Sequence, residues 1–337
     1  MNETREALRA IVRQIEQGEI TDAYRALQAL HNMARDQGDH DVEGIVLHLM
    51  GVVAHEQGRP DEAVALFEKS LEQKRQVGDR QGEGASYHQL GILLQEHGRY
   101  EEAREFFERS LMTARELGDR RAEASALHQL GIVLQEQGRY EEAHEFFERS
   151  LMTARELGDR RAEASAFHQL GVVSQSQARY SEALQYYEKS LAIEEMIGNQ
   201  HGLAVSLNNL GNVYSRLGQR ERALQTYERG LAICRQIGDL SGVSASLRNL
   251  GAALSQLGRS EDAIAALEQS VEIRRRLGDT PSLGYALMSL ALALSTAGKL
   301  PPARDTIEEA LALFDRLGID PPAPVDVLRR RLNETPT

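Results

Sequence analysis

The chain repeats one stretch, LGILLQEHGRYEEAREFFERSLMTARELG at residues 90–118, almost unchanged at residues 130–158. Weaker copies continue at a strict interval of forty residues, without insertions. A glycine recurs at positions 51, 91, 131, 171, 211 and 251, an alanine at 23, 63, 103, 143, 183, 223, 263 and 303, and a second glycine at 38, 78, 118, 158, 198, 238, 278 and 318. Eight units therefore cover residues 1–318. Such a period indicates a repeat architecture rather than a domain with one central core.

The spacing of apolar and small residues predicts two helices in each unit. Within residues 84–97, one helical face carries residues at i, i+3, i+4 and i+7, namely Tyr87, Leu90, Gly91 and Leu94. Residues 100–117 predict a second helix whose inner face carries Ala103, Phe107, Ser110 and Leu111. We expect Gly91 and Ala103 to let the two helices approach closely, with Phe107 filling the space beside them.

Turn residues separate the predicted helices. Gly98 and Gly118 stand where a left-handed C-terminal cap is wanted, because glycine has no Cβ to clash there. The residue after the second glycine suits an N-cap for the next helix: Asp79, Asp119, Asp159, Asp239 and Asp279.

Composition narrows the class of protein. The net charge of −12 arises from interleaved acids and bases, and no predicted helix has a basic face, so nucleic acid is not an expected partner. Cys234 is the only cysteine, which excludes an intramolecular disulfide and favours a reducing compartment. The N-terminal segment MNETREALRAIVRQIEQ lacks an apolar signal region, and no apolar run approaches the ~20 residues of a membrane span. We therefore expect a cytoplasmic protein without membrane contact.

The repeat resembles the tetratricopeptide repeat in the residues that it keeps constant. These are the Leu-Gly pair of the first helix, the alanine that opens the second, the aromatic residue four positions later and the Ser-Leu pair after it. The forty-residue length is similar to that of the repeats in the spindle-orientation adaptor that carries GoLoco motifs and, more loosely, in kinesin light chain. The resemblance implies an all-α, right-handed superhelical solenoid of eight helix-turn-helix repeats, about 16 helices.

The two ends depart from the repeat. The first unit has Ile11 where glycine usually stands and His31 in place of leucine, as expected of a terminal cap. After residues 1–318, residues 319–337 predict a Pro-rich linker and a short helix near Val325 to Leu332. That helix either covers the open face of the last unit or docks elsewhere, for instance on a second copy.

The resemblance also implies that the first helix of each pair lines a concave groove. Helical phase places one polar residue of each unit, its eighth, in a column that recurs every forty residues, with further polar residues beside it. We expect the following residues to form a peptide-binding groove: His48, His88, Gln89, Gln95, Glu96, His128, Gln129, Gln135, Glu136, His168, Gln169, Gln175, Asn208, Asn209, Asn212, Arg216, Arg248 and Asn249.

Three interpretations of these columns compete. Metal binding is disfavoured, because neighbouring helices lie ~8–10 Å apart whereas the ligands of zinc must converge. A second interpretation is that the polar residues merely face water. We favour a ladder of His, Gln and Asn side chains that hydrogen-bonds the backbone of a bound peptide. Acidification through about pH 6.5 should then charge His88, His128 and His168 together.

Charge differs along the predicted groove. Glu96 and Glu136 lie in its N-terminal half, and Arg216 and Arg248 in its C-terminal half. An acidic segment of a ligand should therefore bind near units six and seven. Within the resembling family a peptide carboxylate is sometimes held by Lys, Asn and Arg; Asn208, Asn212 and Arg248 are similar, but Ala252 stands where a second Asn is wanted.

The sequence offers no catalytic motif. It contains no Gly-x-x-x-x-Gly-Lys phosphate loop, no Gly-x-Gly-x-x-Gly after a strand and no Gly-x-Ser-x-Gly elbow. We therefore predict a non-catalytic scaffold or adaptor without cofactor or metal, which binds a peptide or helix of a partner protein. The alternatives are a self-associating protein, joined into dimers or filaments through its end caps or tail, and a peptide-sensing regulatory module.

Overall fold

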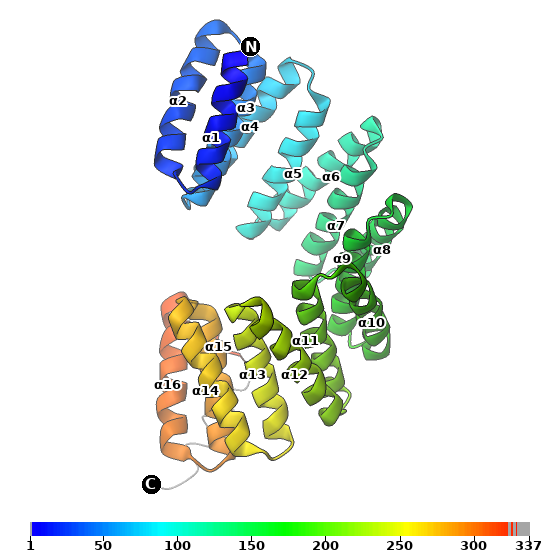
Figure 1. Ribbon diagram of the computed structural model, residues 1–337, viewed down its shortest axis with the longest axis vertical. Coiled ribbons are helices and arrows are strands. Elements are labelled where there is room, and N and C mark those ends of the chain that lie inside the picture. Colours follow the sequence, from blue (N-terminus) through cyan, green and yellow to red (C-terminus); the bar gives the residue numbers. More distant parts are fainter. Residues whose placement is uncertain (1, 323–324, 326–327, 329–337) are drawn as a thin grey trace. The chain divides into compact units, whose positions relative to one another are not determined.

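The computed structural model describes residues 2–322, 325 and 328, except for the side chains of residues 2–5 and 16 (Figure 1). Within residues 2–322 the chain forms sixteen helices and no strand. Their bounds are α1 Asn2–Glu16, α2 Ile20–Gln37, α3 His40–Glu56, α4 Pro60–Gln76, α5 Arg80–Glu96, α6 Tyr100–Leu117, α7 Arg120–Glu136, α8 Tyr140–Leu157, α9 Arg160–Ser176, α10 Tyr180–Ile197, α11 Gln200–Arg216, α12 Arg220–Ile237, α13 Leu240–Gln256, α14 Ser260–Leu277, α15 Thr280–Thr296 and α16 Leu300–Leu317. The predicted all-α array of helix pairs is confirmed.

The helices divide into two compact units, Met1–Ala166 and Phe167–Thr337, with the boundary inside α9. In the N-terminal unit α3 packs on α4, α5 on α6 and α7 on α8. In the C-terminal unit α11 packs on α12, α13 on α14 and α15 on α16. The first helices of successive repeats also touch: α5 contacts α7, and α13 contacts both α11 and α15. Surfaces between successive first helices are therefore shared by neighbouring repeats.

Caps form where the sequence predicted them. The Asp119 side chain accepts a hydrogen bond from the backbone N–H of Ala122 at 3.0 Å, and the Asp279 side chain from that of Ser282 at 3.1 Å. Gly98 and Gly118 have φ values of +72° and +68°, in the left-handed region that glycine adopts without strain. Ala178 occupies the same turn position as Gly98, with φ +59°, and is the one described non-glycine residue with positive φ.

Close packing within a repeat depends on the glycine of the first helix. A Cβ atom at Gly91 would lie 2.6 Å from Cε1 of Phe107, and one at Gly131 the same distance from Cε1 of Phe147. Both phenylalanine rings are fully buried. The role predicted for the Leu-Gly pair is thus confirmed, because only glycine leaves room for the aromatic ring.

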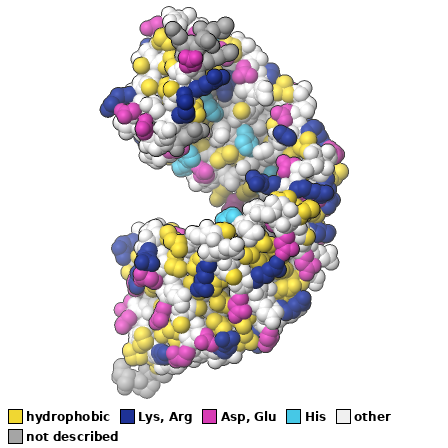
Figure 2. Space-filling model, viewed as in Figure 1, with side chains coloured by type: hydrophobic (Ala, Val, Ile, Leu, Met, Phe, Trp, Pro, Cys, Tyr) yellow, Lys and Arg dark blue, Asp and Glu magenta, His cyan; other side chains and the backbone are white. Residues whose placement is uncertain are grey.

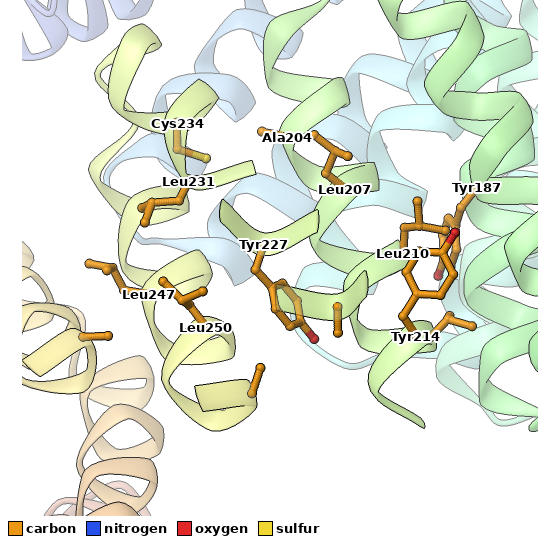
Figure 3. Packing of buried hydrophobic residues seen from close by; sticks show 14 of the residues in the cluster. Tyr187, Ala204, Leu207, Leu210, Tyr214, Tyr227, Leu231, Cys234, Leu247 and Leu250 are labelled. Atoms are coloured by element: carbon orange, nitrogen blue, oxygen red, sulfur yellow. The ribbon is translucent and has the colours of Figure 1, made fainter. Parts of the chain in front are cut away.

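The core of the C-terminal unit contains large side chains from α10 to α13 (Figure 3). Tyr187 is completely buried, and Tyr227 is 3% exposed beside Leu210 and Leu250 of the same cluster. At the chain's end, Val325 and Leu328 are buried against the cluster of α15 and α16. The other residues of the helix predicted near Val325 to Leu332 lie outside the described part of the chain.

Basic and acidic side chains are interspersed over the visible face, without a large patch of either sign (Figure 2). Several of them form ion pairs between repeats: Arg115 of α6, for example, binds the buried carboxylate of Glu123 in α7. Such pairs join the end of one repeat to the start of the next.

Candidate functional site

A polar hollow of about 560 Å³ lies in the C-terminal unit, between the end of α9 and helices α11 to α13. We call it the Arg216 hollow. It is lined by Gln175, Asn212, Ser215, Arg216, Tyr227, Arg248, Asn249, Ala252 and Gln256. Five of the residues predicted for the groove therefore come together here: Gln175, Asn212, Arg216, Arg248 and Asn249.

The hollow has positive charge without a matching carboxylate. Arg216 is exposed and Arg248 half-buried, and neither forms an ion pair within the described residues. Helices α11 and α13 contain no Asp or Glu at all. Burial and the nearby Arg274 lower the pKa of Arg248, so its charge is poorly compensated within the protein. Since arginine stays protonated at neutral pH, an anionic ligand would relieve this imbalance.

Two tyrosines orient the amides of the hollow. The Tyr227 hydroxyl donates to Oδ1 of Asn212 at 2.7 Å, and the Tyr187 hydroxyl donates to Oε1 of Gln175 at 3.2 Å. With each amide oxygen occupied, the amide nitrogens are left as donors toward a ligand. Burial raises the pKa of the Tyr227 phenol, which keeps this hydroxyl a donor.

The sequence assigned the aromatic position of the second helix to packing only, so the part of Tyr227 in the hollow was missed. Its ring is buried in the core (Figure 3), but its hydroxyl binds Asn212, and Tyr227 is part of the lining of the hollow. A signal was available in the aromatic column, where Phe67, Phe107 and Phe147 give way to Tyr187 and Tyr227. A hydroxyl added at two successive repeats indicates a polar partner above the ring.

The N-terminal unit holds the predicted histidines against aromatic rings. Ring centroids lie 5.1 Å apart for His48 and Phe67, and 5.4 Å apart for both His88–Phe107 and His128–Phe147. Several histidine side chains are visible on the surface of this unit (Figure 2).

Histidine nitrogens also face the next repeat. Nε2 of His88 lies 3.4 Å from Oγ of Ser125, and Nε2 of His128 lies 3.5 Å from Oγ of Ser165. In the C-terminal unit the His168 Nδ1 lies 3.2 Å from Ser206 Oγ, and Asn208 donates to Ser246 Oγ at 2.9 Å. This column therefore connects successive first helices.

The expected titration of His88 and His128 near pH 6.5 is wrong. Burial lowers the pKa of His128 to about 4 and also lowers that of His88. Burial, with repulsion from Lys74, lowers the pKa of His48 to about 4. Burial against an aromatic ring deprives the imidazolium of the water that would hydrate its charge, so the neutral form persists well below pH 6.5. Helical phase placed them on the correct face but could not show how deeply they are packed.

The remaining predicted residues are spread along both units. Glu96 pairs with His55 of the preceding first helix at 2.7 Å, and Glu136 is exposed. Gln95 and Gln135 each have a buried Oε1 atom for which the described residues offer no hydrogen-bond donor. Asn209 Nδ2 lies 3.3 Å from Nε2 of His168. At the position before the Leu-Gly pair, Gln89 is exposed, and Gln129, Gln169 and Asn249 are half-buried.

Within the described residues, no three His, Cys, Asp or Glu side chains are grouped so that they could hold a metal ion. A search of the same residues finds no helix with the length and apolar character needed to cross a membrane.

Comparison with known proteins agrees with the repeat fold. A family model described as tetratricopeptide repeat matches residues 3–76, 45–116, 82–156, 162–236 and 242–316. The chain belongs to the tetratricopeptide repeat family. No curated protein matches the sequence.

Several solved structures share the fold of this chain at low identity. The apo form of the quorum sensor NprR from B. thuringiensis is 16% identical with a TM-score of 0.71, over 92% of this chain and 87% of that one. Aspartyl phosphate phosphatase F from Bacillus subtilis is 14% identical with a TM-score of 0.68, over 97% and 94%. A Rap protein complexed with competence and sporulation factor is 15% identical with a TM-score of 0.55, over 88% and 99%.

Proposed function

We propose that this tetratricopeptide repeat protein is a non-catalytic interaction module that binds a peptide segment of a partner protein along its first helices. An acidic part of that segment binds in the Arg216 hollow. The observation that carries the proposal is the pair Arg216 and Arg248 on one polar hollow whose lining contains no carboxylate.

The donors of the hollow suit a carboxylate. Guanidinium groups bind carboxylates through two parallel N–H donors, and such charge-assisted hydrogen bonds are stronger than neutral ones. The amide nitrogens of Asn212 and Gln175, oriented by Tyr227 and Tyr187, add neutral donors at the same surface. The fold similarity to a Rap protein complexed with competence and sporulation factor supports an interaction role for such an array.

Binding is tested with two fluorescein-labelled libraries of random dodecapeptides, one enriched in Glu and the other in Gln. We expect the unmodified chain to prefer the Glu library, and R216E/R248E to lose that preference by a factor of about ten or more, since hydrogen bonds to charged groups contribute roughly 1.5–3 kcal/mol each. Fluorescence anisotropy at constant salt gives both affinities.

The control variant R235E/R276E makes the same change in net charge at two exposed arginines of α12 and α14 that do not line the hollow. It should keep the preference for Glu peptides. If the two double variants lose the same affinity for Glu peptides, the effect is one of general charge and the proposed site is refuted. Full affinity of R216E/R248E for Glu peptides would refute it as well.

A further inference from the structure

A smaller hollow recurs between successive first helices. In the N-terminal unit one such hollow, of about 290 Å³, contains His88, Ser110, Ala114, Ala122 and Ser125. A second, of about 240 Å³, lies forty residues further on and contains His128, Ser150, Ala162 and Ser165. In the C-terminal unit the equivalent hollow, of about 260 Å³, is lined by Ser244, Ala245, Arg248, Ser270, Arg274, Ser282, Tyr285 and Ala286. We call this last one the Arg274 hollow.

The Arg274 hollow differs from its counterparts at four equivalent positions. Arg248 replaces the histidine, and Arg274 stands where the hollow at His88 has Ala114. On the next first helix, Ser282 replaces an alanine, and Tyr285 replaces a serine. At these four positions the hollow at His88 has a histidine, two alanines and a serine, whereas the Arg274 hollow has two guanidinium groups and two hydroxyls.

Arg274 is held in a fixed position. Its side chain is only 10% exposed, and its Nη1 donates to Asp279 Oδ2 at 2.6 Å. Nε donates to Oγ of Ser244 at 3.0 Å, and Nη2 donates to the carbonyl oxygen of Ser241 at 3.0 Å. A guanidinium restrained in this way loses little conformational entropy when a ligand binds beside it.

The charge of the hollow is incompletely balanced. Asp279 pairs with Arg274, whereas Arg248 forms no ion pair within the described residues and lies close enough to Arg274 to be repelled by it. Helices α13 and α15 on either side contain no Asp or Glu. Two cations with one carboxylate leave an excess of positive charge in a partly buried space.

We propose that the Arg274 hollow binds a phosphoryl group, carried either by a phosphorylated serine or threonine of the partner peptide or by a free phosphorylated molecule. A phosphoryl group bears a charge of about −1.5 to −2 and three strong acceptor oxygens. Arg248 supplies a guanidinium group that forms no ion pair within the described residues. Arg274 adds its positive charge and the one N–H that its bonds to Ser241, Ser244 and Asp279 leave over. The hydroxyls of Ser282 and Tyr285 add two neutral donors.

The two hollows share Arg248 as a common wall. A peptide with an acidic segment in the Arg216 hollow can therefore place a phosphorylated side chain in the adjacent Arg274 hollow. The peptide source rests on the proposed function, whereas the phosphoryl site itself does not.

Three probes test the inference on the full chain: a degenerate fluorescent peptide library with one fixed phosphoserine, the same library with serine, and inorganic phosphate. We expect the phosphoserine library to bind about tenfold tighter or more, as charge-assisted hydrogen bonds allow, and phosphate to compete with it. If the two libraries bind equally but phosphate still raises the unfolding temperature, the site is supported and the source is a free phosphorylated molecule. Equal libraries without any effect of phosphate would overturn the inference.

Variants locate the site. S282A/Y285F removes two hydroxyls but keeps the Tyr285 ring, whose centroid lies 5.3 Å from that of Phe314. We expect it to lower the preference for phosphoserine several-fold, and an unchanged preference would refute the assignment. R274M should abolish the preference, with circular dichroism to confirm folding, because Arg274 also binds Ser241, Ser244 and Asp279.

R216A separates this inference from the proposed function. Arg216 lines the other hollow only, so R216A should weaken binding of the Glu library and leave the phosphoserine preference intact. If Glu peptides show no dependence on Arg216 while the phosphoserine preference persists, the proposed function fails and the phosphoryl site stands.

Discussion

The hydroxyl of Tyr187 donates a hydrogen bond to Oε1 of Gln175 at 3.2 Å, whereas the equivalent Oε1 of Gln135 is buried and has no donor among the described residues. Both glutamines occupy the same position of the repeat, one turn beyond the Leu-Gly pair. A single oxygen atom on the aromatic ring thus decides whether the amide oxygen is satisfied.

We predict that Phe147→Tyr stabilises the chain or leaves it unchanged, because the new hydroxyl supplies the donor that Gln135 lacks. The reverse change, Tyr187→Phe, removes a donor and should cost about 1 kcal/mol, the net value of one hydrogen bond. Urea unfolding midpoints measure both effects. A loss of stability in Phe147→Tyr equal to that in Tyr187→Phe would contradict the explanation.

A second prediction concerns the contact of glycine with the aromatic ring. Gly131→Ala places a Cβ 2.6 Å from the buried Phe147 ring, so we expect a loss of about 1–3 kcal/mol from overpacking. Gly230→Ala in α12 provides the control, because the nearest atoms to its Cβ would lie at 3.6 Å, an ordinary contact.

Alanine also has a higher helix propensity than glycine, by roughly 0.5–1 kcal/mol, so Gly230→Ala should stabilise the chain. Thermal unfolding followed by circular dichroism gives both values. Two glycine replacements with the same effect would show that helix propensity, not the ring, dominates at Gly131.

A third prediction uses the one described non-glycine residue with positive φ. Ala178 has φ +59° where the neighbouring repeats have Gly138 and Gly218, at +73° and +74°. Ala178→Gly should stabilise the chain by about 0.5–1 kcal/mol, because relief of the left-handed strain exceeds the extra entropy of glycine in the unfolded chain.

Gly138→Ala is the matched inverse. A Cβ at Gly138 would meet nothing within 4 Å, so backbone strain alone should lower its stability. We expect the free energy of unfolding in urea to rise in Ala178→Gly and to fall in Gly138→Ala. A lower free energy of unfolding in Ala178→Gly would refute the strain argument.

Much of the fold could be predicted from the sequence because the repeat is regular. The glycine that accommodates Phe107 and the caps at Asp119 and Gly118 follow from local spacing and backbone preference. Helical phase also identified Arg216 and Arg248, since a residue's face depends only on its position along the helix.

The rest of the site depends on contacts between repeats. Arg274 lies on a second helix that the groove prediction did not consider, and its place beside Arg248 follows only from how α14 packs between α13 and α15. The depth of His128 was missed for the same reason, because the Phe147 ring and the following first helix bury it.

The depressed histidine pKa values predict how stability depends on pH. The pKa values of His48 and His128 lie at about 4, and that of His88 is also lowered, against about 6.5 in an unfolded chain. Between these values the unfolded chain binds more protons than the folded one, so the stabilisation is fully present above pH 6.5 and is lost as the pH falls toward 4.

We expect H88N/H128N, which introduces the residue found at the equivalent Asn208, to reduce this dependence. Each neutral histidine contributes a slope of at most about 1.4 kcal/mol per pH unit within the window. Urea unfolding of the parent and the variant at several pH values from 7 to 4.5 gives the difference in slope, from which the shared contribution of carboxylates cancels. Parallel plots of unfolding free energy against pH would show that these histidines titrate alike in the folded and unfolded states. Because the histidines stay neutral in the folded chain, its affinity for the Glu library should show no step near pH 6.5 that depends on them.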